Sequence, residues 1–543
     1  CSFVTGERLS HRPAFQMENS FYGVLPGLTV LFQNGLPSSQ SLIFLRGHIP
    51  LILVDGIPRS DANIPVSQIE SLSVVKDGLG LSQLGMSSGN GILNIKTKRG
   101  ETSKMQVGFT VQRANSKEIF RPEHLDAYQY GMLLNEARAN DGLSALYSQQ
   151  DLDLYRSGEK PYTHPNVDWM DLILKESAPI EQYSLNFTGG TKDARYFVDL
   201  NYYNQAGFIK EDNSINSYST SNNYKKFSLR TNLDIELSPT TTLQTNFFGQ
   251  MFREIATGKS VSNIYSALNG TPHNAYPVMN PDSTLGGSPQ YINNIYGQTI
   301  KSGYYLYPKS DLNIDVILTQ RFTGAFEGMY MKGTYSYNSS YREALNRSKN
   351  FGVYYFWQDP NDTTEPTSAN YTQLTSDGTQ ANATAYNRQN RLLNGSLEWG
   401  YDYESGKHNL QSKLTGNYSN YLLMGTGLPF KTGGVSLSES YSYDNRFLAE
   451  LALNMYQSSQ YKPGHRWGFF PAAGIGWVMS NESWFSEKVP FLSYLKLRTS
   501  YGVNGDNGAS SFYRLGTGNV SDYYNYMKYY NSYGSVYSGG STI

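Results

Sequence analysis

The chain has 543 residues, enough for about three ordinary domains or for one large β architecture. It carries 44 Lys plus Arg against 45 Asp plus Glu, and this balance excludes a protein that binds nucleic acid through bulk positive charge. The single cysteine, Cys1, excludes an intrachain disulfide and a Cys-based zinc or iron–sulfur site.

Residues 1–100 are predicted to form a small mixed domain. Short apolar runs bounded by Gly and Pro predict strands at 25–32, 42–47, 50–58, 69–78 and 91–100. The Asp55-Gly56 pair between apolar flanks predicts a tight turn. The chain opens without the basic start and apolar core of a signal peptide, and Cys1 is interpreted as a chain end left by processing or truncation rather than as a lipidated cysteine.

From about residue 104 the pattern changes to long alternating segments. In 227–238 the side chains of Phe227, Leu229, Leu233, Ile235 and Leu237 fall on one face, and Arg230, Asp234 and Glu236 fall on the other. The same alternation recurs at 183–188, 195–203, 393–403, 447–455 and 495–503. A period of two predicts strands with one apolar and one polar face.

Two architectures satisfy this alternation: a soluble sandwich with its apolar faces inside, and a membrane barrel with its apolar faces toward lipid. The charged polar faces suit a wet lumen. The segments reach the roughly 9–11 residues that cross a bilayer, and aromatic residues gather toward the strand ends. The barrel is therefore the favoured fold, although no run approaches the 18 or so apolar residues of a membrane helix.

Connection lengths give a sharper argument for the barrel. Short links at 189–194, 238–241, 405–408 and 444–446 alternate with long ones such as 113–180 and 341–390. Bacterial barrels have short turns on the periplasmic side and long loops outside. About thirteen strands are expected by residue 503. An odd number leaves the barrel open, so the chain is expected to lack further strands at its C-terminal end.

Specific segments then add a family resemblance. The chain resembles the SusC/RagA-type TonB-dependent outer-membrane transporters of Bacteroidota in LIFLRG (42–47), PLILVDGIP (50–58), IESLSVVKDG (69–78) and NGILNIKTKRG (90–100), and, further along, in the segments 166–209, 227–238, 466–485 and 495–508. The resemblance covers nearly the whole chain, in order.

The resemblance implies a 22-stranded antiparallel barrel filled by an N-terminal α/β plug, with the plug at 1–100 and a partial barrel with long extracellular loops at 101–543. It implies TonB-dependent import of a large nutrient, an oligosaccharide or a peptide, through the outer membrane. The implied partners are a SusD-like surface lipoprotein, the TonB-ExbB-ExbD complex and outer-membrane lipid. No cofactor and no enzymatic activity are implied.

Departures from the family pattern keep other functions open. Only His48 and Ile49 separate Gly47 from Pro50, where relatives usually carry a longer connection, and the N-terminal extension and TonB box of the family are not seen in this sequence. These departures motivate an alternative, a non-transporting SusC-like scaffold subunit of an outer-membrane assembly complex. A surface β protein that binds glycans through its tyrosines is a third hypothesis.

The sequence shows no catalytic constellation and no metal-ligand spacing: none of the seven histidines forms H-E-x-x-H, and DPNDTTE at 359–365 is interpreted as a solvated turn rather than a calcium site. In the plug, the charged residues Arg46, Asp55, Lys76 and Asp77 are candidates for contacts that hold the plug to the barrel wall, and for gating. A turn role for Asp55 and Asp77 weighs about equally.

Aromatic residues of the outer loops are candidates for contacts with substrate or with a lid. They are Tyr354, Tyr355 and Trp357 in one loop, and Tyr523, Tyr524, Tyr526, Tyr529 and Tyr530 near the C-terminal end. Flat rings beside amides and hydroxyls suit sugar faces and peptide backbones alike. For the C-terminal group, an interface with a lid or a self-packed loop is slightly favoured.

Overall fold

The architecture comes from a computed structural model of the chain. The model describes residues 2–12, 16–59, 63–85, 88–212, 214–216, 218–359, 362, 364–423, 429–461, 464–489 and 491–505. The five C-terminal tyrosines proposed above therefore lie outside the described residues.

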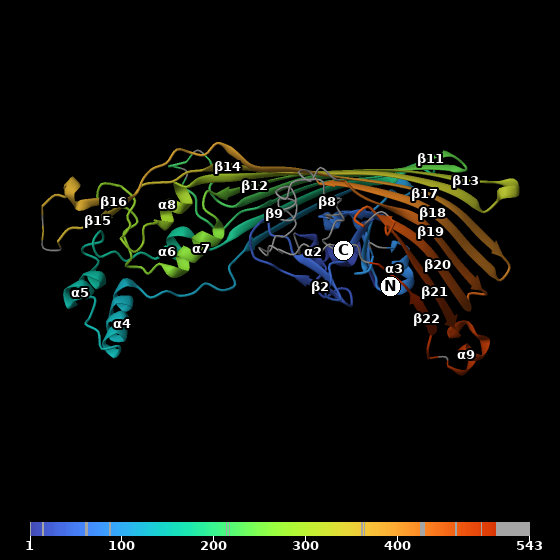
Figure 1. The fold of residues 1–543 in the computed structure, drawn as a ribbon, viewed down its shortest axis with the longest axis horizontal. Helices are drawn as coiled ribbons and strands as arrows, with labels where there is room; N and C mark the ends of the chain where they lie inside the picture. Colours follow the sequence, from blue (N-terminus) through green and yellow to red (C-terminus); the bar gives the residue numbers. More distant parts are fainter. Residues whose placement is uncertain are drawn as a thin grey trace.

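A large antiparallel sheet of thirteen strands forms the body of the molecule, and it curves around one side of the plug (Figure 1). Each strand pairs with its neighbour in the chain, except that β14 pairs with β17 across the small β15–β16 hairpin. The strands are β8 (Ser103–Ser116), β9 (Ala178–Gly190), β10 (Ala194–Gln205), β11 (Asn223–Ser238), β12 (Thr241–Thr257), β13 (Gly303–Arg321), β14 (Met329–Ser348), β17 (Ala383–Ser405), β18 (His408–Leu423), β19 (Phe430–Tyr443), β20 (Phe447–Ser458), β21 (Trp467–Val478) and β22 (Lys496–Gly502). The predicted strand number and the antiparallel meander are confirmed.

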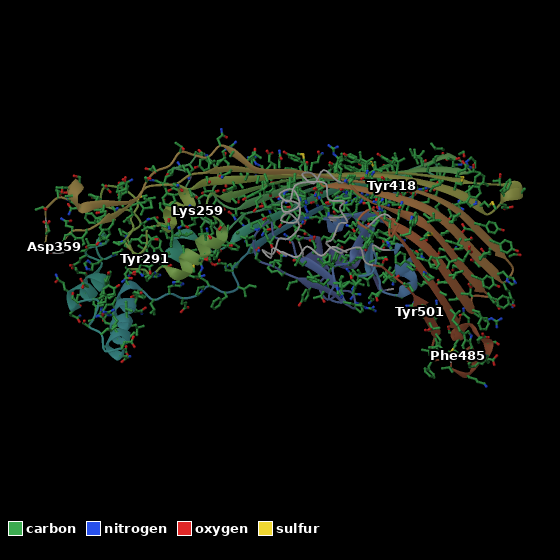
Figure 2. All side chains as sticks on the ribbon, in the orientation of Figure 1. Lys259, Tyr291, Asp359, Tyr418, Phe485 and Tyr501 are labelled. Atoms are coloured by element: carbon green, nitrogen blue, oxygen red, sulfur yellow. The ribbon has the colours of Figure 1, made fainter. Side chains whose placement is uncertain are left out.

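The predicted faces of these strands are confirmed as well. On β11 the side chains of Phe227 and Leu237 are exposed on the convex face, while Arg230 and Asp234 are buried on the concave face beside the plug. Figure 2 shows Tyr418 of β18 on the same convex side. An apolar outer face and a polar inner face are the pattern of a membrane barrel.

From β8 to β21 the connections alternate in length as predicted, with tight turns at one end of the sheet and the longer, partly helical loops at the other (Figure 1). The last connection, 479–495 between β21 and β22, departs from this pattern, since it is long and carries α9 (Ser483–Lys488) at the tight-turn end. Some strands are longer than the alternating segments indicate: β13 begins at Gly303 rather than near 311, and β17 begins at Ala383 rather than near 390. Residues 303–310 carry aromatic side chains on both faces, and residues 383–389 are mostly polar, so neither extension shows a period-two signal.

Five strands of the plug form a second sheet, in the order β1–β6–β7–β4–β5, with β4 parallel to β7. The plug elements are β1 (Ser2–Thr5), α1 (Gly6–Ser10), α2 (Met17–Ser20), β2 (Leu28–Leu31), β3 (Leu42–Leu45), β4 (Leu51–Val54), β5 (Ile57–Arg59), β6 (Ile69–Val75), α3 (Gly78–Ser82) and β7 (Ile92–Thr97). Its core gathers fully buried apolar side chains, among them Leu9, Phe21, Leu72, Leu93 and Ile95. Strand β1 and the three short helices were not predicted, because segments of four or five residues are too short to show a period.

The predicted tight turn joins β4 to β5. Asp55 and Gly56 have φ values of 52° and 81°, and Val54 pairs with Ile57 across the turn. Two positive φ values are the signature of a type I′ turn, whose twist matches that of the flanking strands.

Outer loops supply most of the remaining secondary structure. It comprises α4 (Ala127–Asn140), α5 (Gln149–Ser157), α6 (Trp169–Ile173), α7 (Val261–Gly270), α8 (Ile295–Ile300) and the hairpin of β15 (Val353–Phe356) with β16 (Tyr371–Thr375), while α9 (Ser483–Lys488) lies at the opposite end of the sheet. Short 3₁₀ turns occur at Val66–Gln68, Gly324–Phe326, Ser368–Asn370 and Met479–Asn481. Among the described residues, no helix has the length and apolar character needed to cross a membrane.

Candidate functional site

Two of the predicted plug residues, Arg46 and Lys76, contact the plug itself. The Arg46 guanidinium donates to the backbone oxygen of Lys76 at 3.2 Å, and Lys76 Nζ donates to the oxygen of Pro26 at 2.6 Å. Both bonds join the β2–β3 part of the plug to the end of β6. In this structure, the pair therefore stabilises the plug internally.

Asp55 and Asp77 both organise the local backbone. The Asp55 carboxylate accepts from the Thr97 backbone N–H at 2.9 Å and from its hydroxyl at 2.7 Å, which ties the β4–β5 turn to the end of β7. Asp77 is the N-cap of α3 and accepts from the Gly80 N–H at 2.9 Å. Its other oxygen lies 3.9 Å from the Arg498 guanidinium of β22, so Asp77 also faces a charge on the wall.

The strongest described contact between plug and wall begins at Arg59, the last residue of β5. Its Nη2 donates to both carboxylate oxygens of Asp315 on β13, at 2.6 and 2.8 Å, and its Nη1 donates to Ser336 Oγ on β14 at 3.1 Å. The Arg59 and Asp315 side chains are 2% and 5% exposed. A bidentate pair of this kind fixes geometry as well as charge.

A second contact places Gln68 between two opposite wall charges. Its Nε2 donates to Asp199 Oδ1 on β10 at 2.7 Å, and its Oε1 accepts from Arg230 Nε on β11 at 2.8 Å. Asp199 and Arg230 are register partners in the sheet. The plug amide therefore takes a place that a direct ion pair between two neighbouring strands would otherwise occupy.

The third contact lies where the plug ends. Arg99 forms an ion pair with Asp234 of β11, with Nε donating at 2.9 Å, and its Nη1 donates to Asn246 Oδ1 of β12 at 2.9 Å. Asn232 Nδ2 donates to Thr97 Oγ1 at 2.9 Å and to the Lys98 backbone oxygen at 2.6 Å. Burial lowers the pKa of the nearby Lys98 ammonium, and the charge of Asp199 opposes that shift.

Charged and amide side chains of the plug therefore meet charged and amide side chains of the wall at one surface, which we call the plug–wall interface. Its plug residues are Arg59, Asn63, Gln68, Thr97, Lys98 and Arg99. Its wall residues are Asp199, Lys226, Arg230, Asn232, Asp234, Asn246, Asp315 and Ser336. Several buried polar atoms here have no protein partner among the described residues, including Arg59 Nε, Asn232 Oδ1 and Asn246 Nδ2. Water usually satisfies buried polar atoms of this kind, so the interface suits hydration.

Close backbone approaches complete the seating of the plug. A Cβ on Gly100 would lie 2.2 Å from the backbone N of Tyr196 on β10, and a Cβ on Gly85 would lie 2.3 Å from the Tyr456 ring on β20. Tyr456 in turn donates from its hydroxyl to the Gln83 backbone oxygen at 3.0 Å. At these two positions, only glycine lets plug and wall approach this closely.

Most contacts in the plug–wall interface were missed from the sequence. Lys98 and Arg99 lie inside a quoted plug motif, and Arg230 and Asp234 were assigned to the polar face of their strand. What was missing is their pairing: Arg59 and Asp315 are 256 positions apart in the chain. An isolated charge on a strand gives no signal of its partner at that separation.

The outer loops form a compact apolar unit, which we call the outer cluster. Its buried core consists of Trp169, Met170, Ile173, Leu174, Ile209, Ile264, Leu268, Tyr276 and Ile295. The Trp169 and Tyr276 rings lie 4.7 Å apart, and Trp169 Nε1 donates to the Pro272 oxygen at 3.3 Å. His273 stacks on His124 with 6.2 Å between ring centroids, and burial lowers the His273 pKa, opposed first by Asp168.

The three predicted aromatic residues in and just after β15, Tyr354, Tyr355 and Trp357, differ in their exposure and contacts. Tyr354 is built into the loop scaffold, since its backbone oxygen accepts from Gly287 N at 2.9 Å and from Asn280 Nδ2 at 3.1 Å. Burial raises the pKa of the half-buried Tyr355 hydroxyl. Trp357 is 58% exposed and lies two positions before Asp359, which Figure 2 shows at the outer extremity. The described residues contain no group of three or more His, Cys, Asp or Glu side chains arranged to hold a metal.

The sequence and structure of the chain are similar to those of known proteins. Residues 1–92 match the model of the TonB-dependent receptor plug domain. TonB-dependent receptor P26 of Formosa agariphila is 23% identical over 94% of this chain and 52% of its own length. TonB-dependent receptor SusC of Bacteroides thetaiotaomicron is 22% identical over 92% of this chain and 51% of its own length. A solved structure of the RagAB peptide importer in its open-open state superposes with a TM-score of 0.69 and 18% identity, covering 93% of this chain and 59% of that one.

Residues 1–92 form a TonB-dependent receptor plug domain, and the chain is similar along nearly its whole length to TonB-dependent receptors of the SusC/RagA type. The predicted fold, a TonB-dependent-receptor barrel with an N-terminal plug, is confirmed, with thirteen barrel strands described. The siderophore receptor PirA of Acinetobacter baumannii shares the fold more distantly, with a TM-score of 0.52 over 88% of this chain and 59% of that one. This receptor chain spans about half the length of the curated relatives that it matches.

Proposed function

We propose that this receptor imports a large nutrient, an oligosaccharide or a peptide, across the outer membrane by TonB-dependent movement of its plug. The observation that carries the proposal is the plug–wall interface. The plug sits on the concave face of the sheet through hydrogen bonds and ion pairs, among them Arg59 with Asp315 and Arg99 with Asp234.

Contacts of this kind are suited to a part that must seal and also move. An apolar interface exposes its whole surface to water when it opens, at about 25 cal/mol per Å². A polar contact exchanges its partner for water when it opens, so its net contribution to stability is only about 1 kcal/mol for a neutral hydrogen bond. Buried charges without a complete set of protein partners make such an exchange with water easier still.

The same architecture supports a membrane location and a set of partners for the proposed import. The apolar convex face suits outer-membrane lipid, and the plug requires a periplasmic source of force, which we assign to the TonB-ExbB-ExbD complex. The outer cluster and the exposed Trp357 offer a rigid aromatic rim for a SusD-like lipoprotein and its cargo. The RagAB peptide importer, whose structure is similar, is by its name an importer of peptides, and this supports a peptide as one of the two cargo classes.

A reversible clamp between plug and wall tests the proposal. A Cβ on Gly474 of β21 would lie 3.5 Å from Leu79 Cδ2 of α3 and would meet no atom closer than 3.3 Å, so cysteines at the two positions are close enough to be bridged. The full-length receptor with Leu79→Cys and Gly474→Cys is expressed in a strain that depends on it for growth on a defined oligosaccharide pool or a peptide digest. Growth is expected to stop under oxidation and to resume after mild reduction.

Each single-cysteine variant serves as the matched control and is expected to support growth under both conditions. Deletion of TonB is expected to abolish growth of every variant. Continued growth of the oxidised double variant, with the crosslink verified on a gel, would overturn the import mechanism. Loss of an outer-membrane complex without loss of uptake would favour the scaffold function instead.

A further inference from the structure

A cavity lies on the concave face of the sheet, between the plug and the first residues of α7. It holds about 770 Å³, and its lining includes the plug residues Leu36, Ser38 and Gln40 together with side chains of β11 to β14, β17 and α7. The Ser38 hydroxyl donates to Glu254 Oε1 on β12 at 2.8 Å and joins the plug to the wall here. Figure 2 shows Lys259, another lining residue, on the outer-loop side of the plug. In the proposed function, cargo entering past the outer loops would meet the plug at this cavity.

Cations lie in one row across the concave wall of the cavity. Lys309 on β13 is the register partner of Arg342 on β14, and Arg342 is the register partner of Arg388 on β17. On the other side of Lys309, the row passes through Phe252 of β12 to Lys226 of β11. We call Lys226, Lys309, Arg342 and Arg388 the cation row. Lys226 is buried against the plug, whereas Arg342 and Arg388 are exposed, so the row leads from the plug to two accessible arginines.

The charges that line the cavity include three cations and two carboxylates, namely Lys259, Lys309, Arg342, Glu254 and Glu343. Both carboxylates already accept hydrogen bonds from hydroxyl groups of this chain, and Asp311 lies 3.1 Å from the Lys309 ammonium. Arg342 and Arg388 carry like charges directly opposite each other, an arrangement that repels, and an anion held between them offsets that repulsion. The cation row therefore favours an anionic group in the cavity.

Tyrosine rings lie beside the cation row, on its outer side. Tyr307 stands two positions before Lys309 on β13, and Tyr386 stands two positions before Arg388 on β17, so each ring shares the concave face with the cation of its strand. The Tyr305 and Tyr307 rings are nearly parallel, with 9° between their planes and 5.9 Å between their centroids. Flat aromatic faces of this kind suit the apolar faces of sugar rings. Rings and cations together therefore suit a saccharide that carries acid groups.

The spacing of the cation row favours a saccharide over an acidic peptide. Neighbouring strands of a sheet lie about 4.8 Å apart, so members of the row on neighbouring strands repeat at that interval. Side chains on one face of an extended peptide repeat about every 6.7 Å. A chain of pyranose rings advances by about one strand spacing per ring, so its acid groups stay in step with the row.

We propose that this cavity binds an anionic oligosaccharide, with its acid groups on Arg342 and Arg388 and its sugar rings against Tyr307 and Tyr386. The inference rests on the proposed import function and selects a charged saccharide as the cargo. A neutral saccharide would use the rings without the cations, and an acidic peptide would use the cations without the stacking.

Calorimetric titration of the detergent-purified, full-length receptor tests the charge of the cargo. The probes are a galacturonic acid oligomer and its fully methyl-esterified form, which keeps the same sugar rings and loses the charges. We expect the acid form to bind about tenfold more tightly at low salt and to lose most of this advantage in about 0.5 M salt, since salt screens exposed charges. Equal affinity of the two forms at low salt would overturn the proposal.

A double variant tests the two arginines. Arg342→Gln with Arg388→Gln is expected to weaken binding of the acid form about tenfold, since two charge-assisted contacts are lost. The esterified form is expected to bind this variant as before, which checks that the cavity remains folded. The matched control is Arg253→Gln with Arg391→Gln, two exposed arginines on the outward face of β12 and β17, and it is expected to keep full binding. Equal losses of acid-form binding in the two double variants would overturn the proposal.

A ring variant and a peptide probe test the saccharide assignment. Tyr307→Ala is expected to weaken the acid and the esterified oligomer alike, about fivefold, through lost stacking. Hexaglutamate is expected to bind the unmodified receptor more weakly than the acid oligomer, and binding as tight as that of the oligomer would overturn the assignment in favour of a peptide. Titration in detergent requires neither TonB nor plug movement, so these results fail independently of the clamp experiment that tests import.

Discussion

The plug–wall interface is held together by polar contacts, whereas the outer cluster is held together by buried apolar side chains. At the plug, the described contacts with the wall run through charged and amide groups such as Arg59, Gln68 and Arg99, with buried polar atoms left for water. In the outer cluster, Trp169, Ile264, Leu268 and their neighbours bury one another almost completely. Apolar packing therefore holds the outer cluster in shape, whereas polar pairs join the two surfaces that separate in the proposed import mechanism.

The largest expected loss of stability comes from a substitution in the apolar core of the outer cluster. Trp169 is 1% exposed and stacks near Tyr276, so Trp169→Ala is expected to destabilise the outer cluster by about 3–5 kcal/mol through lost burial and the cavity left behind. Hydrogen exchange of α6, α7 and α8 in the purified receptor measures the loss. The plug amides are expected to keep their protection, and Trp357→Ala, at an exposed position, serves as the control.

The effect of changing the plug–wall interface should depend on whether one partner of an ion pair is removed or both are. Arg59→Ala leaves Asp315 buried without its cation and is expected to weaken plug seating by about 3 kcal/mol. The double variant Arg59→Met, Asp315→Leu removes both charges and is expected to restore most of that stability. Hydrogen exchange of β5 and β7 reports plug seating.

The double variant should also import poorly, because an apolar contact would resist the exchange for water that opening requires. Arg46→Ala, which loses a bond within the plug, is the matched single-cation control and should leave β5 protection unchanged. If Arg59→Ala had no more effect than Arg46→Ala, the polar interface would not be what seats the plug.

Acid should act on the outer cluster through His273. Burial holds the His273 pKa below its usual 6.5, so the unfolded loop binds more protons than the folded loop as pH falls through that value. Stability is therefore present above the usual pKa and is lost on acidification. After correction for the pH dependence of intrinsic amide exchange, the protection factors around His273 are expected to fall between pH 7.5 and pH 5.5.

His273→Gln is expected to remove this acid step, and His465→Gln, at an exposed histidine, is expected to retain it. An unchanged acid response in His273→Gln would assign the step to another group, with His124, Asp126 and Asp168 as the charged neighbours to examine next.

The smallest effect is expected at Asp77 and Arg498. Their 3.9 Å separation and the 61% exposure of the Arg498 side chain predict less than about 0.5 kcal/mol from Arg498→Ala. Plug exchange rates within error of the unmodified receptor would confirm this. If Arg498→Ala weakened plug seating as much as Arg59→Ala does, exposed ion pairs would also help to hold the plug against the wall.

Local signals predicted the fold well in this chain. The Asp55-Gly56 turn, the alternation along β11 and the unequal loop lengths each depend on neighbouring residues, so one sequence is enough to read them. The plug–wall interface depends on partners that lie hundreds of positions apart, such as Arg59 and Asp315. The predicted Arg46 and Lys76 are plausible plug charges by type, but the backbone turns them toward the plug itself.

The glycines at the seam between plug and wall have a consequence for how such receptors diversify. Gly85 and Gly100 admit no side chain because Tyr456 and Tyr196 of the barrel already occupy that space. A plug transplanted from a relative would meet a mismatched surface wherever its own small residues fall elsewhere. Crossovers between related genes should therefore rarely separate a plug from its own barrel, so that the two are inherited together. The outer loops, which lie away from these contacts, should exchange more freely.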